Sequence, residues 1–277
     1  MEYVKRGLHN TINSIKKNKL LFLAIFLLQI IFVVSSLWLG SQYLIKILED
    51  TQGIIGPLEN ANYDSQQIEK GEAFTPDYAS IYNSYQSMLK NVMIFAAWMA
   101  ALYLLLNGSI WLLSHWMLQE KKPWRLRVRE GFQFFLKAWA SIFLLLAPFK
   151  IASYYVLLHF IRVSQSFDNI AVVLKILLVA LFVVSYLLLV ALAAAPVPSW
   201  KQFAKMWVKV SIVKFKKTMI LFFLIAAALF ASFAALYGAI EYEKSAALLL
   251  LLGLFCIMII SVTRIFWIAG IQEIGRE

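Results

Sequence analysis

Six long stretches of the chain carry almost no charge, and they set the pattern of the whole sequence. Four contain no Asp, Glu, Lys or Arg, and the other two contain one charged residue each, Lys150 and Arg264. The stretches are 20–45, 91–119, 138–161, 176–200, 218–240 and 245–272. A helix rises about 1.5 Å per residue, so each stretch is long enough to cross about 30 Å of hydrocarbon. The pattern predicts an all-α, polytopic membrane protein with six transmembrane helices.

Basic residues gather in three of the segments that separate these stretches. The segments precede the first stretch, join the second to the third, and join the fourth to the fifth, so six spans place all three on one side. The residues are Lys5, Arg6, Lys16, Lys17 and Lys19; Lys121, Lys122, Arg125, Arg127, Arg129 and Lys137; and Lys201, Lys205, Lys209, Lys214, Lys216 and Lys217. Cytoplasmic loops carry an excess of Lys and Arg. We therefore expect a multi-pass protein of the cell membrane with both termini in the cytoplasm.

The junction before the first stretch resembles the junction before the fifth. Residues 14–20 read Ser-Ile-Lys-Lys-Asn-Lys-Leu, and residues 214–220 read Lys-Phe-Lys-Lys-Thr-Met-Ile. In both, a lysine pair and a small polar residue lead into an apolar span. The chain is therefore interpreted as a single membrane domain, 1–277, built from three hairpins that are each preceded by a basic interfacial elbow helix. The repeat units are approximately 1–119, 120–200 and 201–277.

The elbow before the fifth stretch shows the spacing of an amphipathic helix most clearly. Five residues follow one apolar face beside lysines four positions apart; they are Phe203, Met206, Trp207, Val210 and Val213. Such a helix lies in the headgroup layer, with its apolar groups toward the acyl chains and its lysines toward phosphates. The alternative is an ordinary basic loop. The lysines assigned to the membrane surface are Lys16, Lys17, Lys201, Lys205, Lys209, Lys216 and Lys217.

The chain resembles the uncharacterised six-span membrane-domain families of bacteria and archaea. The resemblance is the pattern of an elbow followed by a hairpin, with the junction Lys16-Lys17-Asn18. One of these families is the membrane domain attached to some glycerophosphodiester phosphodiesterases. The resemblance extends over most of the chain and implies the six-span fold. The catalytic barrel of those phosphodiesterases has no counterpart in this sequence, so the resemblance implies no such activity.

The outer loop between the first two spans, 47–90, departs from this compact pattern. Gly53, Gly56 and Pro57 predict the end of the first helix. Helical spacing then resumes from Tyr78 and leads into the second span. We expect a short helical cap over the outer surface, with residues 60–75 as its most mobile part.

Composition supports the membrane assignment and narrows the function. Hydrophobic residues make up 62% of the 277 residues and charged residues only 15%, whereas soluble domains are about 45–50% apolar and about 25% charged. This balance argues against an ordinary cytosolic enzyme, a disordered chain and a nucleic-acid-binding domain. The net charge of +11 favours contact with anionic lipid. The single cysteine, Cys256, excludes an internal disulfide.

Motifs for covalent chemistry are missing from the sequence. The histidines His9, His115 and His159 are far apart, and the chain has no HExxH, Walker, GxSxG or Rossmann pattern. None of the six stretches contains an acid that would serve as an intramembrane proton relay. We therefore expect a non-enzymatic protein with no cofactor and no metal site.

Three polar residues inside the predicted spans form the candidate ligand site. Lys150, Arg264 and Asn107 lie at broadly similar depth, about 12–18 Å from the inner boundary. A charge at a helix centre costs about 2.5–3.5 kcal/mol, so such residues usually face the bundle interior or water. The hypothesis is an anion or phospholipid-headgroup site in the inner half of the membrane. The alternative is that Arg264 reaches the inner surface and Lys150 occupies a small wet pocket.

Small residues predict where helices pack closely. Ala227, Ala231, Ala235 and Ala239 form a stripe along the fifth span, and the fourth span ends in a run of alanines before Pro196. Such faces let helix backbones approach each other in lipid. We expect packing within the chain, although the same stripe also suits a dimer.

The favoured function is a lipid-interacting or lipid-organising membrane module. The alternative is a transporter or permease subunit whose cytoplasmic elbow helices dock a partner, and a membrane-embedded lipid enzyme fits least. The expected partners are membrane lipids, especially anionic ones, together with a second copy of the chain or a cytoplasmic protein. Nucleic acid is not expected as a partner.

Overall fold

The computed structural model describes residues 2–60, 78–119, 124–163, 167–197, 199–242 and 244–277. Every regular element in these ranges is helical. Six of the helices are long and apolar enough to cross a membrane: 19–57, 79–118, 127–156, 171–194, 215–241 and 246–276. The described residues thus form an all-helical protein with six candidate membrane spans, as the uncharged stretches predict.

The outer surfaces of these spans are apolar. Trp38 is 62% exposed, Leu144 74% and Phe230 76%, although each lies in the middle of a candidate span. Large apolar side chains avoid water in soluble proteins. Their exposure along whole helices suits a hydrocarbon solvent, which supports a multi-pass membrane protein.

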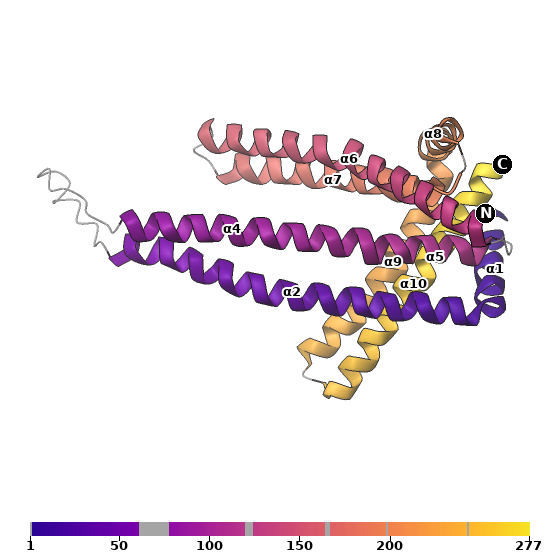
Figure 1. Cartoon of the computed structure of the whole chain (residues 1–277), viewed down its shortest axis with the longest axis horizontal. Helices are drawn as coiled ribbons and strands as arrows, with labels where there is room; N and C mark the ends of the chain where they lie inside the picture. The colour runs from indigo at the N-terminus through magenta and orange to yellow at the C-terminus, as the bar shows by residue number, and fades with distance from the viewer. Residues whose placement is uncertain (1, 61–77, 120–123, 164–166, 198, 243) are drawn as a thin grey trace, which may run out of the picture. The chain divides into compact units, whose positions relative to one another are not determined.

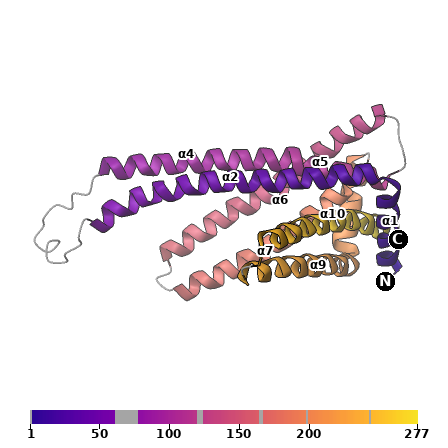
Figure 2. The same ribbon diagram turned by 90° about the horizontal axis from the view of Figure 1, so that it is seen from below.

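The described residues form two compact units, and residues 28–107 make up one of them. Most of it is a pair of helices, α2 (Lys19–Asn60) and α4 (Tyr78–Leu102), which run side by side in opposite directions (Figures 1 and 2). A five-residue π-helical turn, η1 (Tyr103–Asn107), follows α4. Polar and aromatic contacts join the pair, because Asn91 donates from Nδ2 to Oδ2 of Asp50 at 2.8 Å and the rings of Tyr43 and Phe95 lie 5.8 Å apart.

The expected break after the first span is wrong, because α2 continues through Gly53, Gly56 and Pro57 to Asn60. Gly53 serves close packing there: a Cβ atom on it would lie 2.5 Å from Oγ of Ser84 in α4. Pro57 lies in the last turn of α2, where its missing N–H removes only one backbone hydrogen bond. The second helix begins at Tyr78 as predicted. The expected mobile segment falls almost entirely within residues 61–77, outside the described residues.

The other unit contains residues 1–27 and 108–277. Helix α6 (Trp124–Val163) pairs with α7 (Phe167–Ala194), and α9 (Phe215–Glu241) pairs with α10 (Ala246–Arg276) (Figures 1 and 2). Shorter elements gather at one end of these pairs. They are α1 (Glu2–Lys17), α5 (Gly108–Leu118), α8 (Trp200–Val208) and a second π-helical turn, η2 (Lys209–Val213).

The two alanine-rich segments of this unit, at the end of α7 and along α9, differ in burial. The alanine-rich end of α7, residues 191–195, is buried within the hydrophobic core. On α9, in contrast, three residues of the predicted stripe, Ala227, Ala231 and Ala235, are exposed, and Ala239 is buried. The α9–α10 contact uses Ser232 instead, whose carbonyl lies 3.3 Å from Sγ of Cys256. The exposed alanines face outward because the buried side of α9 is offset from the stripe.

Candidate functional site

The structure does not gather the three predicted ligand residues around one described cleft. Lys150 is exposed on α6 and has no hydrogen-bond or ion-pair partner among the described residues. Arg264 is half-buried in α10, with its guanidinium 5.5 Å from the ring centre of Trp111. Asn107 is buried in the other compact unit. A polar cleft elsewhere in the unit of residues 1–27 and 108–277 is the better candidate.

Two glycines position the helices that form this cleft. A Cβ atom on Gly7 of α1 would lie 3.3 Å from the backbone of Gly270 in α10. A Cβ atom on Gly270 would in turn lie 2.4 Å from Cδ2 of Leu221, which is fully buried in α9. Because Gly7 carries no side chain, α1 crosses close over α10, and because Gly270 carries none, α10 packs close against Leu221 of α9.

The buried face of α1 is a narrow stripe of small and polar residues. Tyr3, Gly7 and Thr11 are buried, whereas Leu8 and Ile12 are 47% and 44% exposed. The hydroxyl of Tyr3 donates to the carbonyl of Lys217 in α9 at 3.3 Å, and burial raises its pKa above the usual value of 10. The helix is therefore fixed to α9 and α10 by its small residues and leaves its aliphatic residues outside.

The chain bends at Asn18, between α1 and the start of α2 (Figure 1). The backbone bonds from Asn18 to Ser14 and from Phe22 to Asn18 are kept, at 3.0 and 3.1 Å. The side chain of Asn18 donates to the carbonyl of Met117 at 3.2 Å. Carbonyls in the last turn of a helix lack an intrahelical partner, so Asn18 caps α5 and holds it beside α1.

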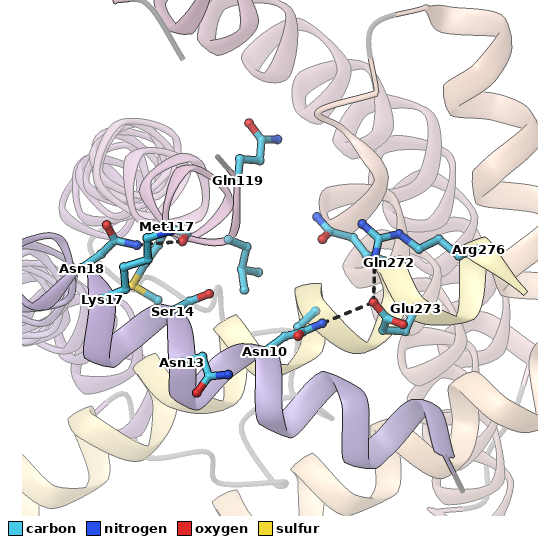
Figure 3. A pocket seen from close by; sticks show the side chains of 12 residues that line it. Asn10, Asn13, Ser14, Lys17, Asn18, Met117, Gln119, Gln272, Glu273 and Arg276 are labelled. Atoms are coloured by element: carbon cyan, nitrogen blue, oxygen red, sulfur yellow. Dashed lines mark hydrogen bonds and ion pairs between the residues drawn. The ribbon is translucent and has the colours of Figure 1, made fainter. Parts of the chain in front are cut away.

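A polar cleft of about 310 Å³ lies where α1, the end of α5 and the end of α10 meet (Figure 3). Its wall is rich in carboxamides, with one hydroxyl, two cations and one carboxylate. These side chains are Asn10, Asn13, Asn18, Gln119 and Gln272; Ser14; Lys17 and Arg276; and Glu273. The volume is at the lower end of the range of small-molecule sites, about 300–1,000 Å³.

The carboxylate of Glu273 is bonded within the wall. Its side chain is only 10% exposed, and its Oε1 accepts hydrogen bonds from Nη1 of Arg276 at 2.9 Å and from Nδ2 of Asn10 at 3.3 Å. Arg276 itself is 74% exposed, so most of its guanidinium faces solvent. The charges of Glu273 and Arg276 therefore offset each other, and Lys17 leaves the cleft with a net positive charge.

The carbonyls at the end of α7 hold the neighbouring helices in place. The indole of Trp207 donates to Leu187 O and that of Trp267 to Leu189 O, each at 3.0 Å. The ammonium group of the buried Lys137 donates to the carbonyl of Val197. These bonds fix α8 and α10 to α7, and α6 to the turn that follows α7.

Two of the seven predicted surface lysines are bonded within the protein. Lys209 donates to the carbonyl of Gly275 at 2.8 Å, and Lys217 pairs with the carboxylate of Glu277, whose pKa it holds below the usual value of 4.5. Both bonds hold the end of α10, where backbone carbonyls attract cations. The others are exposed: Lys16, Lys17, Lys201, Lys205 and Lys216.

The predicted apolar face of α8 and η2 packs against protein. Phe203 and Val210 are buried, and Met206 lies beside Gly275 of α10. Val213, although part of the predicted face, is 71% exposed, and the other exposed large apolar residues are Trp200, Val208 and Ile212, at 52%, 44% and 66%. A helix therefore forms where the spacing predicts one, and most of the predicted apolar face packs against other helices of the protein.

Sequence reasoning missed most of the cleft. Asn18 stands out in the junction motif, and Gln119 and Gln272 mark the ends of uncharged stretches, but these polar residues read as span boundaries. The signal for the site is a set of carboxamides at three span ends, and only the fold shows that these ends meet. Comparison of the chain with protein families, curated proteins and solved structures finds no match to any of them.

Proposed function

We propose that this protein is a non-enzymatic, multi-pass membrane module that binds and organises anionic lipid at its basic end, with both termini in the cytoplasm. The observation that carries the proposal is a pairing of exposed lysines with exposed aliphatic residues on α1 and on α8–η2. These elements are the proposed interfacial elbow helices of a three-hairpin repeat, similar to the membrane domains named above.

Helix α1 supports the proposal through its exposed face. Leu8, Ile12 and Lys16 are spaced four residues apart, so they follow one another along one side of the helix, and all three are exposed. Aliphatic groups followed by a lysine suit the boundary between acyl chains and phosphates.

The segment α8–η2 has a similar exposed face. Lys201 and Lys205 lie one turn apart, and Val208 and Ile212 continue the same side toward the fifth span. The lysines come first and the aliphatic residues are nearest the span. A helix entering the membrane obliquely places lysines at the phosphates and aliphatic groups below them.

Electrostatic attraction gives this surface its lipid preference. A basic residue near an anionic surface contributes about 1 kcal/mol, and this declines within about 8–10 Å at physiological salt. Besides Lys17, which lines the cleft, four of the predicted surface lysines are exposed: Lys16, Lys201, Lys205 and Lys216. Anionic lipids are therefore expected to be enriched around these helices.

The test replaces those four lysines with glutamine and measures the lipids that co-purify in mild detergent. The matched control neutralises four exposed lysines outside the proposed surface: Lys46, Lys90, Lys175 and Lys244. The ratio of phosphatidylglycerol to phosphatidylethanolamine is expected to fall at least about threefold in the first variant and to stay unchanged in the control. Equal ratios in both variants and in the unmodified protein overturn the proposal.

A further inference from the structure

Four side chains of the polar cleft make no hydrogen bond or ion pair with any residue that the structure describes. They are Ser14 and Lys17 of α1, Gln119 at the end of α5, and Gln272 of α10. Figure 3 shows the cleft residues gathered from three separate elements around one opening. The neighbouring Asn10, Asn18 and Glu273, in contrast, already bond to the protein.

We propose that this cleft binds a polyol phosphate, with the phosphate at Lys17 and the hydroxyl groups at Ser14, Gln119 and Gln272. The carboxamides provide both donors and acceptors, which matches hydroxyl groups because a hydroxyl also donates and accepts. Lys17 provides a positive charge that Glu273 does not neutralise, since Glu273 pairs with Arg276.

Other ligand chemistries fit the wall less well. Divalent cations are held by free carboxylates together with neutral oxygens, and the single carboxylate here is paired with Arg276. An apolar ligand requires apolar walls, and only Met117, Leu118 and Ala269 provide them. A doubly charged anion without hydroxyl groups accepts from the N–H groups of the two glutamines but leaves their carbonyl oxygens without a donor.

A second shallow groove extends the cleft along α1. It shares Asn10, Glu273 and Arg276 with the cleft and adds Lys5 and Arg6. Arg6 pairs with Glu2 at 2.5 Å, so Lys5 supplies the groove's further charge. A positive approach of this kind raises the local concentration of an anionic ligand.

The side on which the cleft opens favours a free ligand over a lipid headgroup, and this step rests on the proposed function. Leu8 and Lys17 are nine positions apart on α1, which at about 100° per residue places them on opposite faces. When Leu8 and Ile12 face the acyl chains, Lys17 and the cleft face water. The same chemistry is nevertheless present in the headgroup of phosphatidylinositol.

The experiment uses the full chain in phosphatidylcholine nanodiscs and titrates it with myo-inositol 1-phosphate by calorimetry. Inorganic phosphate and myo-inositol are titrated in parallel. The first has the phosphate without the ring hydroxyl groups, and the second has the ring hydroxyl groups without the phosphate. A second arm incorporates phosphatidylinositol into the nanodiscs and counts bound lipid by native mass spectrometry. Lys17→Met, Gln119→Leu and Gln272→Leu are compared with the controls Lys244→Met and Gln202→Leu, which change exposed residues away from the cleft.

Saturable binding of myo-inositol 1-phosphate that weakens about tenfold in each cleft variant, and not in the controls, supports the proposal. Binding only in the phosphatidylinositol arm, weakened by the same variants, also supports the site but overturns the orientation of α1 in the proposed function. Binding that the cleft variants leave unchanged, or no binding in either arm, overturns the site. A failure of the cleft to bind does not bear on the proposed lipid-binding lysines, because their test replaces other residues.

Discussion

The imidazole of His115 in α5 donates from Nε2 to the carbonyl oxygen of Leu192 in α7 at 3.0 Å. This carbonyl would ordinarily accept the N–H of residue 196, four positions along the helix, but residue 196 is a proline and has no N–H. The side chain of a distant helix thus replaces the missing backbone donor. His115 is fully buried, so the bond forms where water is excluded.

The pairing predicts a specific coupling between His115 and Pro196. Replacing His115 with leucine leaves Leu192 O without its donor and is expected to reduce the free energy of unfolding by about 1–2 kcal/mol. Pro196→Ala restores a backbone N–H, so the same histidine replacement is expected to cost less in that background. A double-mutant cycle by thermal unfolding in detergent measures the coupling. Additive effects within error contradict this role for His115.

The close packing of α10 against Leu221 of α9 predicts strong sensitivity at Gly270. The added Cβ atom of Gly270→Ala would overlap Leu221, which is fully buried, so we expect a loss of about 1–3 kcal/mol. Adding Leu221→Ala removes the overlapping atoms and is expected to recover part of the loss. Gly238→Ala in α9 is the control, since no atom lies within 4 Å of its added Cβ. Equal melting temperatures for Gly270→Ala and Gly238→Ala exclude this close packing of Gly270 against Leu221.

The two charged residues inside the predicted spans, Arg264 and Lys150, are expected to contribute differently to the stability of the fold. Arg264 lies over the ring of the buried Trp111, and we expect Arg264→Met to reduce stability by about 0.5–2 kcal/mol. Lys150→Met is expected to leave the melting temperature unchanged, because Lys150 is exposed and has no partner among the described residues. A large loss in Lys150→Met is the contrary result, since it requires a partner for this lysine.

The ion pair at the end of α10 predicts a dependence on acid pH. Lys217 lowers the pKa of Glu277 in the folded protein, so the pair stabilises the fold above the ordinary pKa of 4.5. This contribution is lost as the pH falls below that value and through the lower folded pKa. The melting temperatures of the unmodified protein and of Glu277→Gln are therefore expected to differ at neutral pH and to converge near pH 3. A difference that persists at low pH contradicts the pairing.

The sequence predicts the spans well because membrane helices are defined by local composition. Runs without charge identify all six candidate spans, and helical spacing locates the start of α4 at Tyr78. Local composition gives the wrong result at Gly53. This glycine allows close contact with another helix, and α2 continues past it. The local pattern also misjudges the apolar face of α8, because spacing shows that Phe203 and Val210 share a side but not what covers it.

The cleft was beyond prediction for a related reason. Asn10, Gln119 and Gln272 are far apart in the sequence; Asn10 lies in the middle of α1, and the two glutamines lie near helix ends. Their proximity depends on the Gly7–Gly270 crossing and on the bond from Asn18 to Met117. Both are long-range contacts that no periodicity reveals. A charge deep in a span indicates a ligand site only when other groups face it, and Lys150 has no partner among the described residues.

Cysteine labelling tests most directly whether the basic helices face the cytoplasm and the loop between α9 and α10 faces the other side of the membrane. In a background with Cys256→Ala, single cysteines replace Gln202 of α8 and Lys244 between α9 and α10. A membrane-impermeant maleimide is then added to intact cells, before and after permeabilisation. The account predicts that the cysteine at position 244 reacts from outside, whereas the cysteine at position 202 reacts only after permeabilisation. Reaction of both positions from the same side contradicts a chain that crosses the membrane between them and presents its basic helices to the cytoplasm.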